Sequence, residues 1–362
     1  MTCQTEGGEI LGVPGRIPDD ERVYLHNQRM GKVVIGRPDL VSSNYLYWLF
    51  IWQEFNRELV ASASGSKILH TAPGRIENFR FPLPPLPAQH AIAQILGSLD
   101  DKIELNRRMN ATLEELAQAI FQSWFVDFDP VRAKAAGRAP VGLDAATAAL
   151  FPASFEEREG RIVPRGWEIT GLDQIATFLN GLALQKFPTE GEAFLPVIKI
   201  AQMRKGHTDD SDRASPDIPG AYIVEDGDVL FSWSGSLEVV LWCGGHGALN
   251  QHLFKVTSNL YPKWFYYLWT RHHLPEFQFI AAGKVTTMGH IQRYHLTEAS
   301  VTLPSLPIMA VAEQTFGPLI NQLIENNLQS RTLVTLRDAL LPQLMSGELR
   351  VRDAERLVEE QQ

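Results

Sequence analysis

Two stretches of the chain carry a heptad pattern, in which apolar residues recur at alternating steps of three and four. One stretch follows Pro87 and the other follows Pro307, and proline is tolerated in the first turn of a helix. We therefore predict two long helices that pack on each other as an antiparallel coiled coil. The predicted seam positions are Leu99, Ile103, Asn106, Leu113, Leu116, Leu319, Leu323, Asn326, Leu333 and Leu336.

Polar and proline residues modify this pattern. Asn106 and Asn326 occupy equivalent seam positions, where asparagine either fixes the register of the two helices or faces solvent or a partner. Pro318 should kink or break the second helix and Pro342 should end it, because proline removes a backbone donor and clashes with the preceding turn.

The two stretches belong to a longer internal repeat. Residues 76–125 align with residues 296–345 at an offset of 220, and the aromatic cluster starting at Tyr45 has a counterpart starting at Trp264. This period is too long for a solenoid, so it indicates two copies of a domain followed by a helix. In the second copy Asn250 lies 83 positions after Trp167, whereas only 26 residues precede the equivalent Asn27. We expect the first domain to lack its opening third.

The remaining segments predict an α+β protein with two mixed α/β domains and the two long helices between them. Alternating apolar runs at 194–200, 221–224 and 228–233 predict strands, and 260–273 predicts an aromatic helix. The predicted organisation is a partial first domain (1–80), a first helix region (81–128), a connector with a short helix near 145–150 (129–162), a second domain (163–302), a second helix region (303–350) and a tail (351–362).

Charge and cysteine content limit the function classes. The net charge of −9 argues against a nucleic-acid partner unless basic groups gather locally. Residues 160–300 are nearly balanced, with 12 basic and 14 acidic groups and seven of the ten histidines, which leaves room for a local basic face. Cys3 and Cys243 form no CxxC spacing, and no signal peptide or membrane-spanning run occurs. We expect a cytoplasmic protein without a membrane partner.

Catalytic motifs are absent from the sequence. It contains no GxxxxGK[ST], GxGxxG or HExxH pattern, no convincing nuclease motif and no methyltransferase motif. We therefore expect a non-catalytic chain that holds no metal or cofactor.

Several segments resemble one family, the specificity subunits of type I restriction–modification systems. Residues 97–110, continuing through 121–128, resemble the central conserved region of these subunits, and residues 336–349 resemble their C-terminal conserved region. Shorter segments resemble pieces of their target-recognition domains, namely Asp228–Ser232, Asn250–His252 and Val163–Trp167.

The resemblance implies that this chain reads DNA and that other subunits of a complex carry out the chemistry. Two target-recognition domains would each read half of a bipartite site on double-stranded DNA, with the coiled coil as a spacer between them. Two methylation subunits and the restriction subunits would bind this frame, and they would hold S-adenosylmethionine, ATP and Mg²⁺. The first domain departs from the family pattern because it lacks a Val-Pro-x-Gly-Trp opening. The alternative is a truncated relic that serves only as a helical scaffold for methylation subunits.

Candidate DNA contacts lie mainly on predicted loops of the second domain. Cations there would bind phosphate, and amide or guanidinium groups would bind base edges. Each cluster fits an ordinary solvated loop as well as it fits a DNA contact. The position of Asn250 at a strand entry favours a structural role. The candidates are Lys199, Gln202, Arg204, Lys205 and His207; Ser232, Trp233 and Ser234; Asn250 and Gln251; Lys284, Thr286, Thr287 and His290; and, in the first domain, Lys67 and His70.

Overall fold

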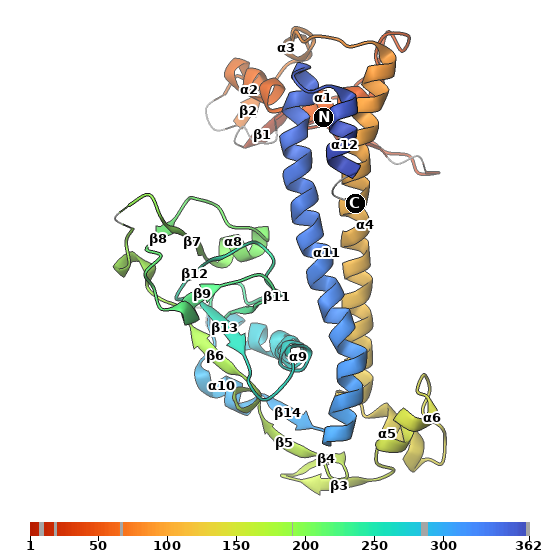
Figure 1. Cartoon of the computed structure of the whole chain (residues 1–362), viewed down its shortest axis with the longest axis vertical. Helices are drawn as coiled ribbons and strands as arrows, with labels where there is room; N and C mark the ends of the chain where they lie inside the picture. Colours follow the sequence, from red (N-terminus) through yellow and green to blue (C-terminus); the bar gives the residue numbers. More distant parts are fainter. Residues whose placement is uncertain (7–10, 18–19, 66–67, 190, 284–288, 360–362) are drawn as a thin grey trace. The chain divides into compact units, whose positions relative to one another are not determined.

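The structure is a computed structural model of the 362-residue chain, and it describes every residue except 7–10, 18–19, 66–67, 190, 284–288 and 360–362. The chain divides into two compact units (Figure 1). The first unit contains Met1–Leu105 and Ser330–Gln362, and the second unit contains Asn106–Gln329. Each unit therefore combines one recognition region with part of both long helices.

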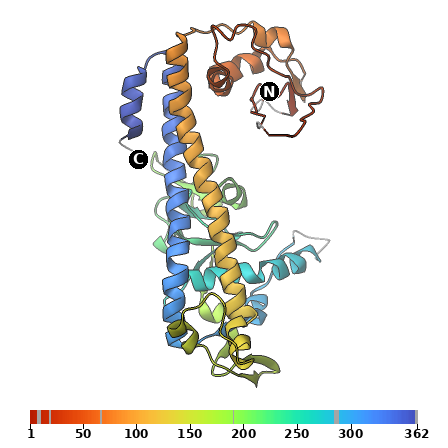
Figure 2. The same cartoon turned by 90° about the vertical axis from the view of Figure 1, so that its right-hand side faces the viewer.

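The two predicted long helices are α4 (Leu86–Phe121), which continues into the π-helical turn η1 (Gln122–Val126), and α11 (Leu306–Ser346). Pro87 and Pro307 are the second residues of these helices and lie in the first turn, as expected. They lie side by side in both views (Figures 1 and 2). In the second unit Asn106 bonds to Asn326 while Asn110, one turn further along α4, bonds to the earlier Leu323. The helices are therefore antiparallel, which confirms the predicted coiled coil.

The seam of α4 differs from the prediction at one residue. Leu116 is 47% exposed, whereas the neighbouring Ala117 is buried. Asn110 also turns toward α11, and Met109 stays exposed. The alternation of four and three therefore runs through Asn110, which bonds to α11, and Ala117, which is buried in the core of the second unit. The prediction of Leu116 as a seam residue was wrong.

Proline does not interrupt α11. The helix passes through both Pro318 and Pro342 and ends at Ser346. The predictions that Pro318 breaks this helix and that Pro342 ends it were wrong. Both prolines are exposed, so the ring lies on the outer side of the helix. Leu340, Leu341, Leu344 and Met345 stay buried on the inner side, and this packing stabilises the helix against the loss of a backbone hydrogen bond.

The seam asparagines are buried and paired within the second unit. Asn106 is 1% exposed, and its amide donates to the Asn326 carbonyl and to Gln329 Oε1, at 3.3 and 2.9 Å. The Asn326 amide donates to Asn110 Oδ1 at 2.8 Å. Positions that are equivalent in the repeat thus meet across the seam, and a polar layer of this kind favours one register. The alternative that these side chains face solvent was wrong.

Two four-stranded sheets form the recognition region of the second unit. The antiparallel sheet has the order β11-β10-β13-β6, and the other has the order β8-β7-β12-β9, in which only β7 and β12 are parallel. A third pair, β5 and β14, connects to the helices. The strands are β5 (Glu168–Gly171), β6 (Thr177–Asn180), β7 (Leu195–Ile198), β8 (Arg213–Ala214), β9 (Ile223–Val224), β10 (Val229–Ser232), β11 (Val239–Leu241), β12 (Gly247–Leu249), β13 (Leu253–Thr257) and β14 (Ser300–Leu303).

Short helices complete this region, and its aromatic helix α9 packs on α11. Trp264 stacks on Phe316 with ring centroids 4.6 Å apart, and its Nε1 donates to Glu313 at 2.7 Å. Trp167, from the predicted Val-Pro-Arg-Gly-Trp segment, packs on Phe125. Burial of these rings is the main force that fixes the sheets to the helix pair. The helical elements are α7 (Leu172–Ile175), η2 (Leu184–Lys186), α8 (Ile200–Lys205), η3 (Gly220–Tyr222), α9 (Lys263–Ala282) and α10 (Arg293–Glu298).

The connector contains more structure than was predicted. The short helix α6 (Ala145–Leu150) lies where it was expected. It is accompanied by α5 (Asp129–Ala135) and by a hairpin of β3 (Phe155–Arg158) and β4 (Arg161–Pro164).

The first unit has its own core around an aromatic helix. Tyr45, Trp48 and Phe55 are buried against the start of α4 and the end of α11. Asp100 and Arg337 pair across the two helices at 2.6 Å. The other elements of this unit are β1 (Gln4–Glu6), which pairs with β2 (Ile68–His70), and α1 (Ser43–Ile51), α2 (Gln53–Ser62), α3 (Pro73–Glu77) and α12 (Val351–Glu359).

Candidate nucleic-acid interface

The candidate residues of the second recognition region gather where two parallel strands end. Val197 and Ile198 of β7 pair with Ala248 and Leu249 of β12. Lys199 follows β7 directly, and Asn250 follows β12 directly. The carboxyl ends of parallel strands meet at the same edge of a sheet, so these two segments become neighbours. The sequence indicated both segments but not that they adjoin.

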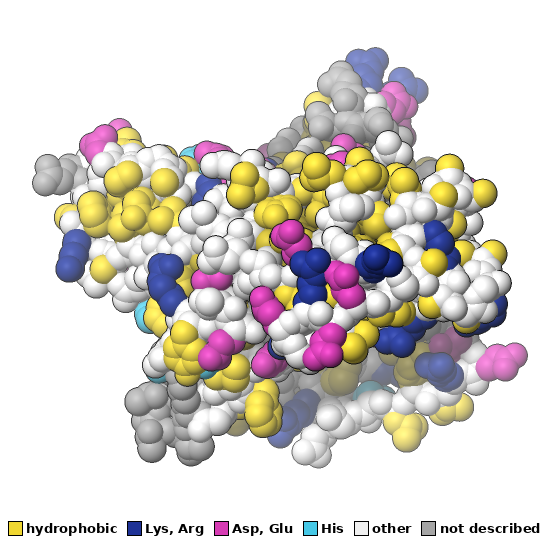
Figure 3. All heavy atoms as spheres, turned by 90° about the horizontal axis from the view of Figure 1, so that it is seen from below, with side chains coloured by type: hydrophobic (Ala, Val, Ile, Leu, Met, Phe, Trp, Pro, Cys, Tyr) yellow, Lys and Arg dark blue, Asp and Glu magenta, His cyan; other side chains and the backbone are white. Residues whose placement is uncertain are grey.

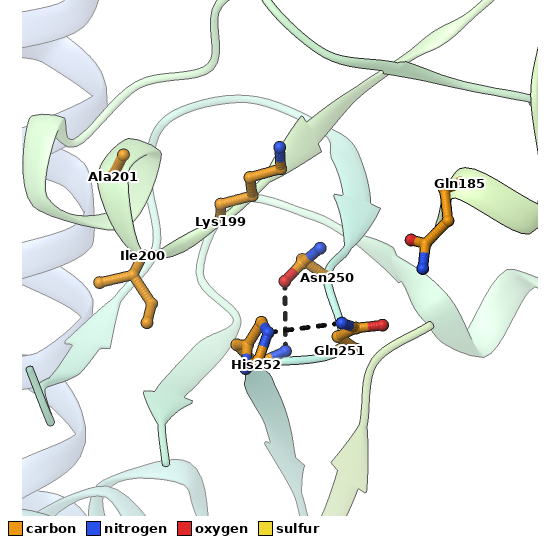
Figure 4. A pocket seen from close by; sticks show the side chains of 7 residues that line it. All are labelled: Gln185, Lys199, Ile200, Ala201, Asn250, Gln251 and His252. Atoms are coloured by element: carbon orange, nitrogen blue, oxygen red, sulfur yellow. Dashed lines mark hydrogen bonds between the residues drawn. The ribbon is translucent and has the colours of Figure 1, made fainter. Parts of the chain in front are cut away.

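A hollow of about 360 Å³ opens at this edge (Figure 4). Within it the Asn250 side chain accepts a hydrogen bond from the His252 backbone N–H at 3.2 Å. The Gln251 amide lies 3.4 Å from His252 Nε2, and its oxygen points away from His252. The lining residues are Gln185, Lys199, Ile200, Ala201, Asn250, Gln251 and His252.

This arrangement separates the roles of Asn250 and Gln251. Asn250 is buried and braces the turn, as favoured from the sequence. Gln251 is only half-buried and faces the hollow. Sequence reasoning missed Gln185, which lies in a 3₁₀ turn without any periodic or motif signal.

The basic cluster after β7 is paired with carboxylates. Lys199 contacts Asp212 at 2.6 Å, Arg204 contacts Glu238 at 3.1 Å and Lys205 contacts Asp209 at 3.1 Å. These pairs are largely exposed, and exposed ion pairs contribute little stability, so the cations can exchange a carboxylate for a phosphate. His207 is also exposed, and its Nδ1 lies 2.9 Å from the Thr208 carbonyl.

Gln202 belongs to the scaffold of this cluster. It is 4% exposed, and its Nε2 donates to both carboxylate oxygens of Asp209. Hydrogen bonds from Ser211, Gln202 and Lys205 hold the pKa of Asp209 well below its usual value. The placement of Gln202 among the DNA contacts is therefore corrected: its amide is occupied and shielded from solvent.

The end of β10 and the turn after it contain two further scaffold residues. Ser232 is 0% exposed, and its Oγ donates to the Ser236 carbonyl and accepts from the Glu238 N–H, both at 2.8 Å. Ser234 is buried, with its Oγ 3.0 Å from His252 Nδ1. Neither side chain is accessible to a base, so the prediction that Ser232 and Ser234 contact DNA is corrected to a structural role.

Trp233 joins this turn to the hollow. Its Nε1 lies 2.8 Å from Asn180 Oδ1 and 3.2 Å from the Gln251 carbonyl. His290 packs edge-on against the Trp233 ring, and its backbone bridges to Ser234. The segments predicted separately around Trp233, Gln251 and His290 therefore adjoin one another. Lys284, Thr286 and Thr287, on the predicted loop before His290, lie outside the described residues.

A second hollow, of about 490 Å³, lies beside the same turn. Arg204 and Glu238 line it together with Gln278 near the end of α9. The basic cluster and the turn after β10 thus share a continuous surface. The full lining is Arg204, Gly235, Ser236, Leu237, Glu238, Gln278, Ala281, Ala282 and Gly289.

The equivalent candidates of the first unit form a smaller group. His70 is exposed at the end of β2, where its backbone bridges to Ser64. Lys67 lies outside the described residues.

Charge is mixed rather than uniformly basic. On the face drawn in Figure 3, Lys and Arg side chains lie among Asp, Glu and hydrophobic side chains. Among the described residues no group of three or more His, Cys, Asp or Glu side chains is arranged to hold a metal ion. Within that same part of the chain, no helix is both long and apolar enough to cross a membrane.

Comparison with known proteins identifies relatives over most of the chain. A family model described as the type I restriction modification DNA specificity domain matches residues 17–115 and 164–331. The chain is 24% identical to the type I restriction enzyme MjaIX specificity subunit of Methanocaldococcus jannaschii, over 87% of this chain and 71% of the relative. It is 25% identical to the HindI specificity subunit of Haemophilus influenzae, over 88% of this chain and 80% of the relative.

A solved structure shares the fold. The type I restriction–modification S subunit from M. genitalium aligns with a TM-score of 0.52 at 15% sequence identity, covering 85% of this chain and 74% of that one. The mixed helix-and-strand architecture is thus one already observed in a specificity subunit.

Proposed function

The chain belongs to the family of type I restriction–modification DNA specificity subunits, and on that premise we propose that it reads a bipartite DNA site, one half with each recognition domain. The observation that carries this proposal is the seam, where the equivalent residues Asn106 and Asn326 meet in an antiparallel helix pair. A repeat built in this way suits a target with two separated halves, since protein symmetry and half-site spacing correspond in DNA recognition.

Recognition by the second domain would use both hollows. Lys199, Arg204, Lys205 and His207 would exchange their present partners for phosphates and set the register on the duplex. Trp233, Gln251 and His290 supply the polar and aromatic groups beside them. In the first domain, His70 would occupy the place that corresponds to His290.

The chain is a non-catalytic subunit of its complex. We propose that two methylation subunits and the restriction subunits bind the helix pair, and that they hold S-adenosylmethionine, ATP and Mg²⁺. Exposed Met109 and Leu116 on α4 support this assignment, because apolar side chains on the outer face of a helix favour a protein partner.

The methylome of a host that lacks DNA methylation tests this function. Co-expression of the chain with its cognate methylation subunit should produce a split motif with two defined halves. A single defined half or a palindrome would contradict reading by two different domains. Absence of methylation, with the methylation subunit still bound, would instead favour the scaffold role.

The basic cluster can be tested by salt dependence. The triple variant Lys199→Ala, Arg204→Ala, Lys205→Ala should weaken DNA binding and lower the salt slope by roughly one for each lost phosphate contact. The control is Arg158→Ala, which removes an equally exposed, carboxylate-paired arginine from the connector. An unchanged slope in the triple variant would contradict the placement of the phosphate contacts.

A further inference from the structure

We infer that Gln251 reads an adenine in the half-site of the second recognition domain, and that Ser234 and His252 hold its amide in the reading orientation. This inference rests on the proposed function and assigns one specificity-determining residue within it. Ser234 and His252 are positioning residues, since they act through Gln251.

The backbone at Gln251 is held from several directions. Trp233 Nε1 lies 3.2 Å from the Gln251 carbonyl, and the neighbouring Asn250 accepts the His252 N–H. Gly181 lies so close that a Cβ atom there would be 2.2 Å from the Asn250 carbonyl oxygen, so only glycine fits. Base readout requires a side chain that starts from a fixed point, and this turn provides one.

The orientation of the amide follows from its neighbours. Gln251 Nε2 lies 3.4 Å from His252 Nε2, and His252 Nδ1 lies 3.0 Å from Ser234 Oγ. When the amide donates to His252 Nε2, that nitrogen must be unprotonated, so Nδ1 carries the proton and donates to Ser234 Oγ. Gln251 then keeps its carbonyl oxygen and one N–H for a ligand. Figure 4 shows the oxygen directed away from His252.

One acceptor beside one donor matches adenine. The adenine edge in the major groove presents the N6 amino group as donor and N7 as acceptor, and glutamine pairs with both. Guanine presents two acceptors at the same edge and therefore pairs with arginine or lysine instead.

The chemistry of the hollow favours a base over a phosphate. Its lining contains three amide side chains and one cation, Lys199, so neutral hydrogen-bonding groups outnumber charged ones. Ile200 and Ala201 form an apolar wall opposite the amides, which suits a base edge or a thymine methyl group.

The test compares methylomes of three variants with the wild type. The wild-type motif first establishes that the proposed function holds. Gln251→Ala should then relax one adenine position of one half-site, with discrimination falling by roughly tenfold or more and all other positions unchanged. Gln174→Ala, which removes an exposed amide of α7 that lines neither hollow, is the matched control and should leave the motif unchanged.

Gln251→Glu provides a readout that a structural role would not produce. A carboxylate accepts but does not donate, so the relaxed position should shift toward cytosine, whose N4 amino group is a donor. An unchanged motif in both Gln251 variants overturns the inference while the wild-type motif still supports the proposed function. If Gln251→Ala abolishes methylation, the motif of Gln251→Glu decides the question. Loss of methylation in both variants overturns the inference.

Discussion

Buried aromatic side chains fix both recognition regions to the long helices, but the two regions differ in how much of their apolar surface is buried. Residues 163–302 form two four-stranded sheets, one of them in contact with α9, whereas the described part of residues 1–80 contains the β1–β2 pair beside α1, α2 and α3. The first region also leaves a series of large apolar side chains in solvent: Val13, Ile17, Val23, Tyr24, Leu25, Met30, Val33, Val34 and Leu40. An aromatic anchor can thus fix a region to the helices without enclosing all of its apolar surface.

Two of these aromatic side chains, Trp264 and Trp48, differ in whether the buried indole N–H has a hydrogen-bond partner. Trp264 of α9 is bonded to Glu313, whereas the buried Nε1 of Trp48 in α1 has no hydrogen-bond partner among the described residues. A buried N–H without a partner reduces the stability that the ring contributes. The second unit also has buried indole N–H groups without a partner among the described residues, at Trp167 and Trp269, so the contrast concerns the pair Trp48 and Trp264 and not the units as a whole.

The largest expected effect tests whether the two units unfold independently of each other. Trp264→Ala should cost about 3–5 kcal/mol of stability, because it removes a buried indole that stacks on Phe316. Hydrogen exchange should report the loss in residues 163–302 and leave Trp48 and its neighbours protected. Equal loss of protection in both units would show that they unfold together.

Conservative substitution sharpens the contrast between the anchors. Trp264→Phe loses a charge-assisted hydrogen bond and should cost about 2–3 kcal/mol in thermal or denaturant unfolding. Trp48→Phe removes an unsatisfied donor and should cost less than about 1 kcal/mol. A larger loss of unfolding free energy for Trp48→Phe than for Trp264→Phe would contradict the view that only the Trp264 N–H contributes a hydrogen bond.

The polar layer in the seam should have an intermediate effect. Asn106→Ala leaves Gln329 Oε1 and the Asn326 carbonyl without their donor, at a cost of about 1–2 kcal/mol. Replacing both Asn106 and Asn326 with leucine should restore stability but relax the register. Cysteine cross-linking at shifted positions of α4 and α11 would detect this relaxation, and a single cross-link pattern would argue against a register role.

The smallest expected effect is acid destabilisation of the second unit. Burial of His273 lowers its pKa below 6.5, while its Nε2 bonds to the Ser300 carbonyl at 2.9 Å. The unfolded chain then binds a proton at a higher pH than the native state, so stability present above pH 6.5 is lost as the pH falls through that value. His273→Gln should show a weaker pH dependence between pH 7 and 5, and an equal dependence would assign the effect to other groups.

The helices and the repeat could be predicted from the sequence, because periodicity and self-similarity are local properties. The bounds of the short helix at 145–150 and the starts of α4 and α11 agree with prediction for this reason. Leu116, Pro318 and Pro342 did not follow the pattern, since tertiary packing buries Ala117 in place of Leu116 and side-chain burial keeps α11 continuous.

The candidate site was predictable only as residue types on loops. The sequence by itself determined that Lys199 follows one strand and Asn250–His252 another, and that amide and basic groups occur there. Only the tertiary structure decided that β7 and β12 pair in parallel, which brings those segments together, and that Gln202, Ser232 and Ser234 are buried while Gln251 is not. The reason is physical: strand pairing and burial depend on contacts between distant parts of the chain, and a local pattern of residues does not encode them.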